Sequence, residues 1–167
     1  PMQDTLHDKA EAERRLWKEI DDVRFGMLGV PASGDHFQPM TAFAEPDDNA
    51  LWFFTNDDNG LIRAVGEGHD AAMFIVQAKD QDYQACIGGR LTEDKDRARI
   101  ERYWNPMVAA WFPRGKDDPS LTLLRFDMID AETWASKGGV RFAWEIAKAN
   151  LTGDTPDVGR QEHINLA

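Results

Sequence analysis

Residue types that commonly do chemistry are sparse in this sequence. Its four histidines and its one cysteine, Cys86, include no pair of histidines four residues apart, the spacing that places two metal ligands on one helix face. The sequence has neither the G-x-S-x-G turn of serine hydrolases nor the G-x-x-x-x-G-K-[ST] phosphate loop. Gly66-Glu67-Gly68 is followed by Ala71 where a dinucleotide-binding motif has glycine. These patterns predict no metal site and argue against serine hydrolase, P-loop and Rossmann proteins.

One segment combines a hydroxyl group with the expected start of a helix. Thr55-Asn56-Asp57-Asp58-Asn59 follows an aromatic run and precedes a short helical pattern. Backbone N–H groups at such a point can hold a phosphate. The two aspartates argue the other way, because they repel an anion. A helix start that is capped by Asp58 is therefore an equal alternative.

Aromatic residues form the other notable group. Four of the six tryptophans lie in the C-terminal half: Trp104, Trp111, Trp134 and Trp144. Core packing is the first expectation for each, with a subunit interface or the wall of a flat ligand's pocket as alternatives. Cys86 lies in an apolar run beside Ile87, which predicts a buried small hydrophobic residue rather than a reactive thiol.

Composition narrows the partners. The 167 residues include 19 basic and 30 acidic side chains, a formal net charge of −11. Such a chain, without a large basic patch, repels a phosphate backbone, so we expect no nucleic acid partner. No apolar run approaches the roughly 18 residues of a membrane helix, so we expect no membrane partner. The single cysteine, and a start without a charged head before an apolar stretch, predict a reducing compartment, most simply the cytoplasm.

Hydrophobic periodicity places the expected elements. Residues 5–22 have apolar positions at helical spacing, which predicts an amphipathic first helix. Apolar runs bounded by turn-forming residues predict six strands, at 25–30, 39–44, 51–55, 71–78, 83–91 and 121–134. Further helices are expected at 61–65, at 94–104 with a loose continuation to 112, and at 140–150, the last with Phe142, Ile146 and Ala149 on its inner stripe.

This order of elements predicts the fold class. Six strands joined by tight turns, with helices between hairpins, do not fit a doubly wound parallel sheet. They fit a mainly β fold, an antiparallel barrel with flanking helices, and a β-sandwich is the alternative. The length suits one domain. We assign it to residues 1–153, including the N-terminal and C-terminal helices, followed by a polar, irregular tail over 154–167.

Several segments, taken in order, resemble the general stress protein branch of the pyridoxamine 5′-phosphate oxidase-like proteins, over residues 5–150. The most specific match runs from Tyr103-Trp104-Asn105-Pro106 through Trp111-Phe112-Pro113 to Lys116-Asp117-Asp118-Pro119. The other matching segments are 38–42, 51–55, 83–89 and 121–125.

The resemblance implies a six-stranded antiparallel split barrel of the FMN-binding type. It also implies a homodimer with FMN, or FAD, in each of two clefts between the subunits. In such proteins the second strand lies along the flavin ring, the residues after the third strand hold the phosphate, and a tryptophan closing the last strand contacts flavin from the other subunit. The cofactor-binding residues implied here are Gln38, Pro39, Met40, Thr41, Phe54, Thr55, Asn59, Arg63, Gln84, Trp134 and Arg141.

Two positions depart from the family pattern. Leu61 stands where a lysine is expected, and Gln38 stands where an arginine often precedes the Pro-Met pair, which leaves only Arg63 near the phosphate. Because a hydrogen bond to a charged group contributes about 1.5–3 kcal/mol, we expect modest flavin affinity. The arginines and histidine that grip a pyridoxal-type phosphate are also incomplete, so pyridoxamine phosphate oxidase activity itself is not expected.

Three functions remain as hypotheses. The first is a flavin-binding stress protein acting as a flavin-dependent oxidoreductase, in which the cofactor supplies the redox step and no catalytic side chain needs to be assigned. The second is a non-catalytic dimer that binds or sequesters flavin or another flat ligand, or has lost it. The third is a small monomeric lipocalin-like carrier with its ligand inside the barrel. The dimeric readings require a second chain to cover tryptophan-rich surface.

Overall fold

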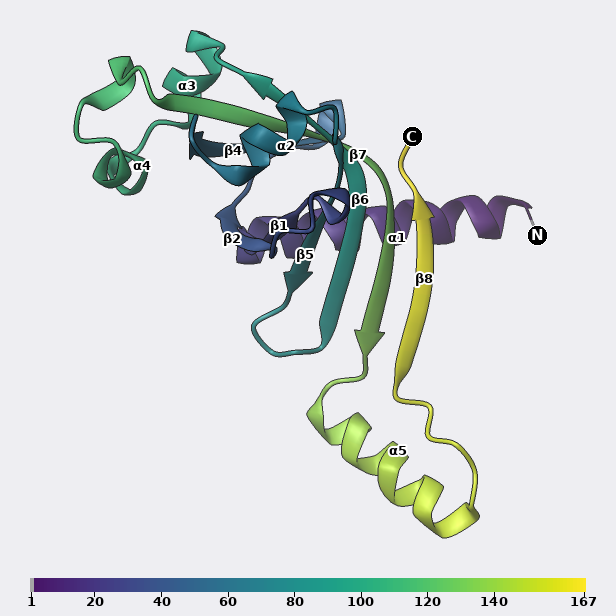
Figure 1. The fold of residues 1–167 in the computed structure, drawn as a ribbon. Coiled ribbons are helices and arrows are strands. Elements are labelled where there is room, and N and C mark those ends of the chain that lie inside the picture. Colours follow the sequence, from purple (N-terminus) through teal and green to yellow (C-terminus); the bar gives the residue numbers. More distant parts are fainter. Residues whose placement is uncertain (1) are drawn as a thin grey trace.

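The computed structural model describes residues 2–167, with side chains from His7 onward. Over this range eight antiparallel strands form one sheet, in the order β2-β1-β5-β6-β7-β4-β3 with β8 beside β7 (Figure 1). The strands are β1 (Phe25–Gly29), β2 (Gln38–Thr41), β3 (Phe43–Glu45), β4 (Ala50–Asn56), β5 (Ala71–Gln77), β6 (Tyr83–Asp94), β7 (Leu121–Ser136) and β8 (Gly159–Asn165). The α-helices are α1 (Met2–Val23), α2 (Gly60–Gly66), α3 (Arg97–Tyr103), α4 (Pro106–Trp111) and α5 (Gly139–Thr152). None of these helices is both long and apolar enough to cross a membrane.

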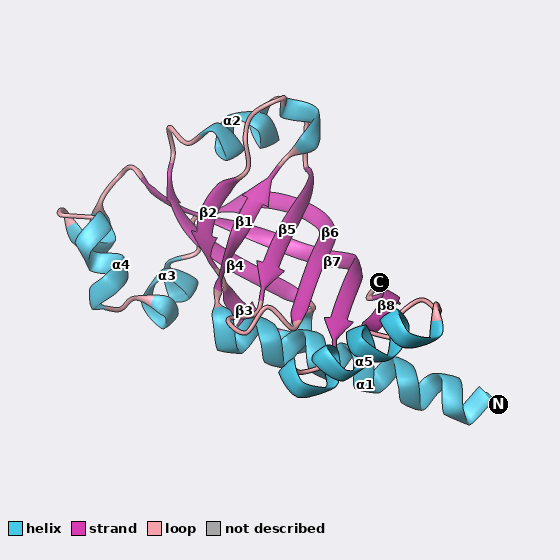
Figure 2. Ribbon diagram, turned by 90° about the horizontal axis from the view of Figure 1, so that it is seen from below, coloured by secondary structure: helices cyan, strands magenta, loops and turns pink. Residues whose placement is uncertain are grey.

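The sheet curls so that its two edges meet. β2 and β3 stand at opposite ends of the strand order, yet only Ala42 separates them in the chain. Ala42 is buried at this corner, and its N–H donates to the Arg24 carbonyl at 2.7 Å. The result is a half-barrel with flanking helices (Figure 2). The predicted mainly β split-barrel fold is confirmed.

The predicted number of strands, six, is wrong for two reasons. The apolar run 39–44 is broken at Ala42 into β2 and β3, because the chain turns from one sheet edge to the other. The tail was predicted to be irregular, yet Gly159–Asn165 forms β8 along the last part of β7. Within β8 only Ile164 is buried, so the segment carries almost no apolar alternation from which a strand could be predicted.

The longest strand, β7, links all parts of the sheet. β6 pairs along almost its whole length, while β4 pairs with residues 121–127 and β8 with residues 130–136 on the other side. At ~3.3 Å per residue, its 16 residues extend over roughly 50 Å. The two ends of β7 therefore lie in different surroundings.

Two hydrophobic cores lie on opposite faces of β4. Leu51 and Phe53 belong to the barrel core, which α1 joins through Leu16 and Ile20. Full burial of such side chains contributes about 1.5–3 kcal/mol each. Large side chains thus fill the barrel interior, which argues against a lipocalin-like carrier with a ligand inside: Leu28, Phe53, Phe74, Ile87, Leu124 and Phe126 are each 0% exposed.

The second core contains the most specific sequence motif. Trp52 packs there with side chains of α3 and α4, and Phe54 and Trp104 border it. The Asn105 side chain accepts a hydrogen bond from the Val108 N–H at 2.9 Å and so caps α4, which has Pro106 in its first turn. Because the chain changes direction at Trp104-Asn105, the predicted helix with a loose continuation is two separate helices.

Helix α5 projects away from the sheet (Figure 1). The predicted helix is present and ends at Gly153, whose φ of 77° suits glycine. Its expected inner stripe is only partly covered, since Phe142 is 43% and Ile146 is 36% exposed and no residue of α5 is buried. The residues described therefore leave this helix without a core of its own.

Candidate functional site

Six of the eleven predicted cofactor residues gather at two places along β7. The first group, here called the amide cluster, comprises Gln38, Thr55, Asn59 and Arg63, from β2, the end of β4 and α2. The second, here called the tryptophan cluster, comprises Gln84 on β6 and Trp134 on β7. Thr55 is opposite Thr122 near the start of β7, whereas Trp134 is close to its end. The two clusters therefore belong to opposite ends of this strand.

Gln38 and Asn59 make direct contact in the amide cluster. Gln38 Nε2 donates to Asn59 Oδ1 at 3.1 Å, and Asn59 Nδ2 donates to Gln38 Oε1 at 2.8 Å. Asn59 Oδ1 also accepts from the Leu61 N–H at 2.8 Å, which makes Asn59 the N-cap of α2. The sequence alternative of a helix start capped by Asp58 is thus wrong by one residue, and Asp58 is exposed.

The charge around the amide cluster is mixed. Arg63 is exposed on α2 and makes no ion pair with any residue whose side chain is described. Asp57 and Asp58 are exposed nearby in the chain. Asp35 Oδ2 lies 3.3 Å from the position that a Cβ atom would take on Gly60. This surface can donate hydrogen bonds to a phosphate, but it offers one cation beside three carboxylates.

Leu61 does not face this surface. Its side chain is 4% exposed and packs in the barrel core with Ile62 and Ala64. A lysine there would have to leave the core to reach a ligand. The lysine expected from the family pattern therefore has no equivalent on the exposed side of α2, where Arg63 is the available cation.

The tryptophan cluster lies where three strands meet. Trp134 is opposite Gln84 on β6 and opposite Gln161 on β8. Trp134 is 42% exposed, and Gln84 Nε2 donates to the Gln81 carbonyl at 3.1 Å. An exposed indole beside amide groups can stack on a flat ring and offer polar contacts to its edge. Gln161 was not singled out, because β8 was not predicted.

The other predicted residues have different surroundings. Pro39 is exposed and Thr41 is half-buried on β2. Met40 packs in the barrel core, and Phe54 packs against Phe43, Trp104 and Phe112, so only their main chains are free to face a ligand. Arg141 is exposed on α5.

The expectation that the tryptophans are core residues holds only in part. Trp104 is half-buried beside the second core. Trp111 is 77%, Trp144 67% and Trp134 42% exposed, so core packing is wrong for these three. The alternatives of a subunit interface and a ligand contact stay as predictions for these three residues.

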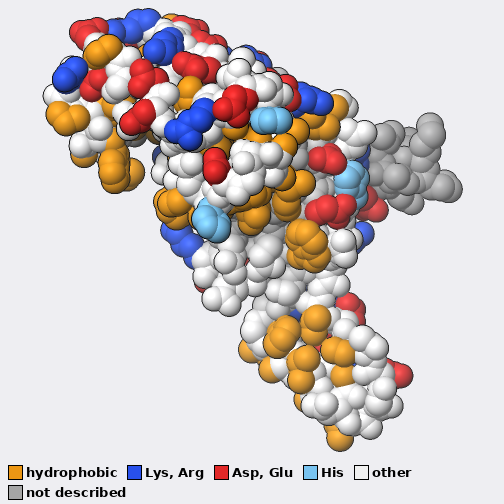
Figure 3. All heavy atoms as spheres, viewed as in Figure 1, with side chains coloured by type: hydrophobic (Ala, Val, Ile, Leu, Met, Phe, Trp, Pro, Cys, Tyr) orange, Lys and Arg blue, Asp and Glu red, His pale blue; other side chains and the backbone are white. Residues whose placement is uncertain are grey.

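The side of the sheet that faces away from the barrel core also exposes large apolar residues. This surface, here called the outer sheet face, carries Phe25, Met27, Met73 and Ile75 from β1 and β5, between 38% and 56% exposed. Figure 3 shows hydrophobic side chains gathered over this part of the sheet. These strands were predicted from continuous apolar runs, and such runs place apolar residues on both faces of a sheet.

Cys86 lies on the outer sheet face and is half-buried rather than buried. Its Sγ lies 3.7 Å from Met73 Sδ. Burial, and then the carboxylates of Asp130 and Glu132, raise the pKa of the thiol. The thiolate is disfavoured, which agrees with the predicted unreactive character.

An acidic group borders the outer sheet face. His163 Nδ1 lies 2.6 Å from Glu132 Oε1, and His163 Nε2 lies 3.7 Å from Asp130 Oδ2. The hydrogen bond with His163, and then that with Gln161, lowers the pKa of Glu132. Among the described residues, no group of three or more His, Cys, Asp or Glu side chains is arranged to hold a metal ion.

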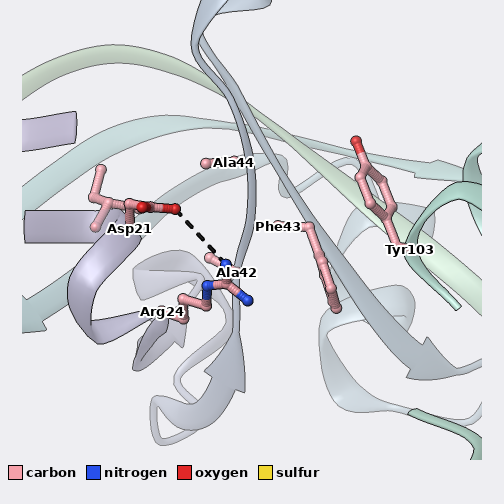
Figure 4. Close-up of a pocket in the computed structure, with 7 residues that line it drawn as sticks. Asp21, Arg24, Ala42, Phe43, Ala44 and Tyr103 are labelled. Carbon is pink, nitrogen blue, oxygen red and sulfur yellow. Dashed lines mark ion pairs between the residues drawn. The ribbon is translucent and has the colours of Figure 1, made fainter. Parts of the chain in front are cut away.

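A cavity and a groove lie beside α1, and neither is lined by a predicted cofactor residue. A cavity of about 150 Å³ lies between the end of α1, the β2–β3 corner and Tyr103 (Figure 4). There the Tyr103 ring stacks on Phe43 with centroids 5.0 Å apart, and its hydroxyl donates to Glu45. A groove of about 510 Å³ lies beside α1, with mixed charges that include Arg15, Glu19 and Asp82. The predicted cofactor residues of one chain therefore do not line either hollow.

Comparison with known proteins identifies relatives of this chain. Residues 11–157 match the family described as Pyridoxamine 5′-phosphate oxidase like. A solved structure named as a general stress protein 26 from Jannaschia sp. is 34% identical, covering 94% of this chain and 99% of that one, with a TM-score of 0.78. The general stress FMN/FAD binding protein from Xanthomonas citri is 39% identical, covering 78% and 92%, with a TM-score of 0.71.

A more distant structure shares the fold. The Clostridium acetobutylicum protein related to general stress protein 26, of the pyridoxinephosphate oxidase family, is 13% identical over 93% of this chain and 95% of that one, with a TM-score of 0.68. A search of curated proteins found no match.

Proposed function

Because the chain belongs to the pyridoxamine 5′-phosphate oxidase-like family, we propose that it is a flavin-binding general stress protein whose flavin sites lie between two copies of the chain. The name of the Xanthomonas relative, an FMN/FAD binding protein, supports flavin as the ligand. The observation that carries the proposal is the position of the two clusters at opposite ends of β7. A single cysteine without a possible partner in its own chain suits a reducing cytoplasm.

The separation of the clusters supports a shared site. Thr122, opposite Thr55, and Trp134 are twelve residues apart on β7, about 40 Å along the strand. A single flavin ring does not contact both ends of such a strand. In a two-fold symmetric dimer, a surface near the start of one β7 can meet the end of the other, and the same contact then occurs twice. We therefore assign the amide cluster to one subunit and the tryptophan cluster to the second subunit at each site.

The donor set of the two clusters fits a flavin mononucleotide. The Asn59 amide and the Arg63 guanidinium suit the phosphate, while the backbone of β2 suits the polar edge of the ring. Thr55 is only 7% exposed, so its hydroxyl is the least accessible donor of the cluster. Gln84 and Trp134 of the second copy supply an amide and an aromatic surface. One cation beside three carboxylates predicts weaker phosphate binding than a site with several cations.

When bound, a flavin itself supplies hydride or electron transfer. The residues of this chain bind, orient and shield it, so the oxidoreductase proposal requires no side-chain acid or base. We propose FMN as the cofactor, because the cluster around Thr55, Asn59 and Arg63 provides for one phosphate. A titration with FAD tests this choice directly.

The charge of the amide cluster favours a second candidate, a dimer that binds or sequesters flavin without turning it over. Weak cofactor retention suits binding and release better than repeated turnover. The two candidates differ in one measurement, the rate at which nicotinamide donors reduce the bound flavin in the absence of oxygen. Fast reduction by NADH or NADPH supports the oxidoreductase, and reduction no faster than for free flavin supports sequestration.

The proposal as a whole is tested on freshly purified protein. An absorbance spectrum and mass spectrometry of the released ligand identify any flavin, and a titration of the ligand-free protein with FMN gives the affinity. Light scattering gives the mass, which we expect to be twice the 18.9 kDa of one chain. A protein that shows no flavin, no spectral change or thermal shift with FMN, and the mass of one chain would contradict it.

A further inference from the structure

Helix α5 carries an apolar stripe that faces solvent. Val140, Trp144, Ala147 and Leu151 follow the spacing i, i+4, i+7 and i+11, which places them on one side of a helix. Val140 and Leu151 are each 88% exposed, and Trp144 is 67% exposed. The stripe that the sequence predicted to face inward, Phe142 and Ile146, is the less exposed of the two. The outward stripe therefore needs a partner of its own.

Two cations accompany this outward stripe. Arg141 and Lys148 are two helical turns apart and lie along one edge of it. Neither makes an ion pair with the described side chains, whereas Glu145, on another side of α5, is paired with Lys137 at 3.6 Å. In a chain with a net charge of −11, an apolar stripe beside two free cations suits a partner surface that is apolar and acidic.

The chain itself has such a surface. The outer sheet face exposes Phe25, Met27, Met73 and Ile75, and the carboxylates of Asp130 and Glu132 border it. In the register of the sheet, Met73 and Ile75 on β5 are level with Asp130 and Glu132 on β7. Only Gly88 and Cys86 of β6 lie between them. Helix α5 of the same chain extends away from this face (Figures 1 and 3). A second copy can bring its α5 to it.

We propose that the outward stripe of α5 docks on the outer sheet face of a second copy, with Arg141 and Lys148 directed to Asp130 and Glu132. This inference rests on the proposed flavin-binding dimer and names the element that holds it together. Each chain gives one helix and receives one, as two-fold symmetry requires. Since α5 begins three residues after β7 ends, docking also fixes Trp134 against the other subunit.

The test uses the full chain with matched variants. The stripe variant, Trp144→Glu with Leu151→Glu, places two negative charges at exposed positions of the outward stripe. The control variant, Ala143→Glu with Asn150→Glu, adds the same charge on the edge of the helix away from Arg141 and Lys148. Light scattering, with all proteins at the same micromolar concentration, gives the mass of the unchanged protein and of each variant. We expect the stripe variant to have half the mass of the unchanged protein and the control variant to keep the dimer mass. Thermal unfolding establishes that both variants are folded.

A mixing experiment identifies the surface that receives α5. Met27→Glu with Ile75→Glu on the outer sheet face is expected to abolish the dimer as well. When this variant is mixed with the stripe variant, one intact helix meets one intact sheet face, so dimers of two different chains should reappear. Dimers in the stripe variant alone, or no dimers in the mixture, would overturn the proposal.

Further outcomes separate this inference from the proposed function. If the unchanged protein does not bind FMN but the stripe variant loses the dimer, the docking inference stands and the flavin proposal fails. If the unchanged protein binds FMN and the stripe variant stays dimeric, the docking inference fails alone. An unchanged protein that is monomeric and sediments with phosphatidylserine vesicles through the same stripe would also overturn it, because α5 would then be a membrane-surface helix.

Discussion

Gln38 and Asn59 hold each other through two hydrogen bonds between their side-chain amides, at 3.1 and 2.8 Å. They are 21 residues apart in sequence, and the pair ties β2 to the start of α2. Asn59 Oδ1 accepts a further bond from the Leu61 N–H. One side chain therefore caps a helix and fixes its position on the sheet.

This double role predicts an order of stability among three variants. Asn59→Ala removes the cap and both amide bonds and should lower the free energy of unfolding by about 1–2 kcal/mol. Gln38→Ala removes only the amide pair, and Asn59→Asp keeps the cap acceptor, so both should cost less. Urea unfolding measures all three. Equal losses for Asn59→Ala and Gln38→Ala would show that the cap contributes nothing.

Gly88 and Gly89 on β6 lie opposite a bulge in β7, where Ile129 has no partner on β6, and they give a second prediction. A Cβ on Gly89 would lie 2.3 Å from the Asp127 carbonyl oxygen and 2.7 Å from the buried Phe126 ring, neither of which can easily move. A Cβ on Gly88 would meet mainly the Asp130 carboxylate at 2.5 Å, which can rotate away. We expect Gly89→Ala to destabilise by more than about 2 kcal/mol and Gly88→Ala by less than half of that. Thermal and urea unfolding of the pair check this, and similar losses would contradict the bulge geometry.

The strands could be predicted where an apolar run is bounded by turn-forming residues. In the run 71–78 nearly every residue is apolar, so the sequence indicates a strand, while the alternation between buried and exposed positions comes from the structure. The break at Ala42 could not be predicted, because both halves of the run 39–44 are apolar and the corner comes from closure of the sheet. Strand β8 could not be predicted either, since β7 supplies its hydrogen-bond partners and Ile164 alone is buried within it.

The site was only partly accessible to sequence reasoning. The segment around Thr55 and Asn59 was found from its turn and helix signals, but the partner of Asn59 is Gln38, which is distant in sequence. Leu61 belongs to the predicted apolar helical pattern and lies in the barrel core, so the family lysine at this position is no guide to the ligand side of α2. The exposure of Trp111, Trp134 and Trp144 depends on tertiary packing, which no local pattern encodes.

Glu132 predicts a specific pH dependence. Its folded pKa is lowered first by the hydrogen bond with His163. The ionised carboxylate therefore stabilises the fold above the ordinary glutamate pKa of about 4.3, and this contribution is lost as pH falls through the lower folded pKa. Relative to Glu132→Gln, the unchanged protein should be more stable at pH 5 and lose that advantage toward pH 3. In a His163→Gln background, replacing Glu132 with Gln should cost less stability at pH 5. A difference in free energy of unfolding between the unchanged protein and Glu132→Gln that stays constant from pH 5 to pH 3 would contradict the assignment.

The division of the flavin site between two chains predicts rescue on mixing. Arg63→Ala and Trp134→Ala should each weaken FMN binding by at least about tenfold, because each removes a charged or stacking contact from both sites of its own dimer. In a mixed dimer, one site receives Arg63 and Trp134 intact from different chains, and the other site receives neither. Random exchange should therefore restore full affinity at about a quarter of all sites, measured by titration at limiting FMN. Arg114→Ala, which alters an exposed arginine outside both clusters, should leave binding unchanged. If Arg63 and Trp134 of the same chain served one site, mixing would restore none.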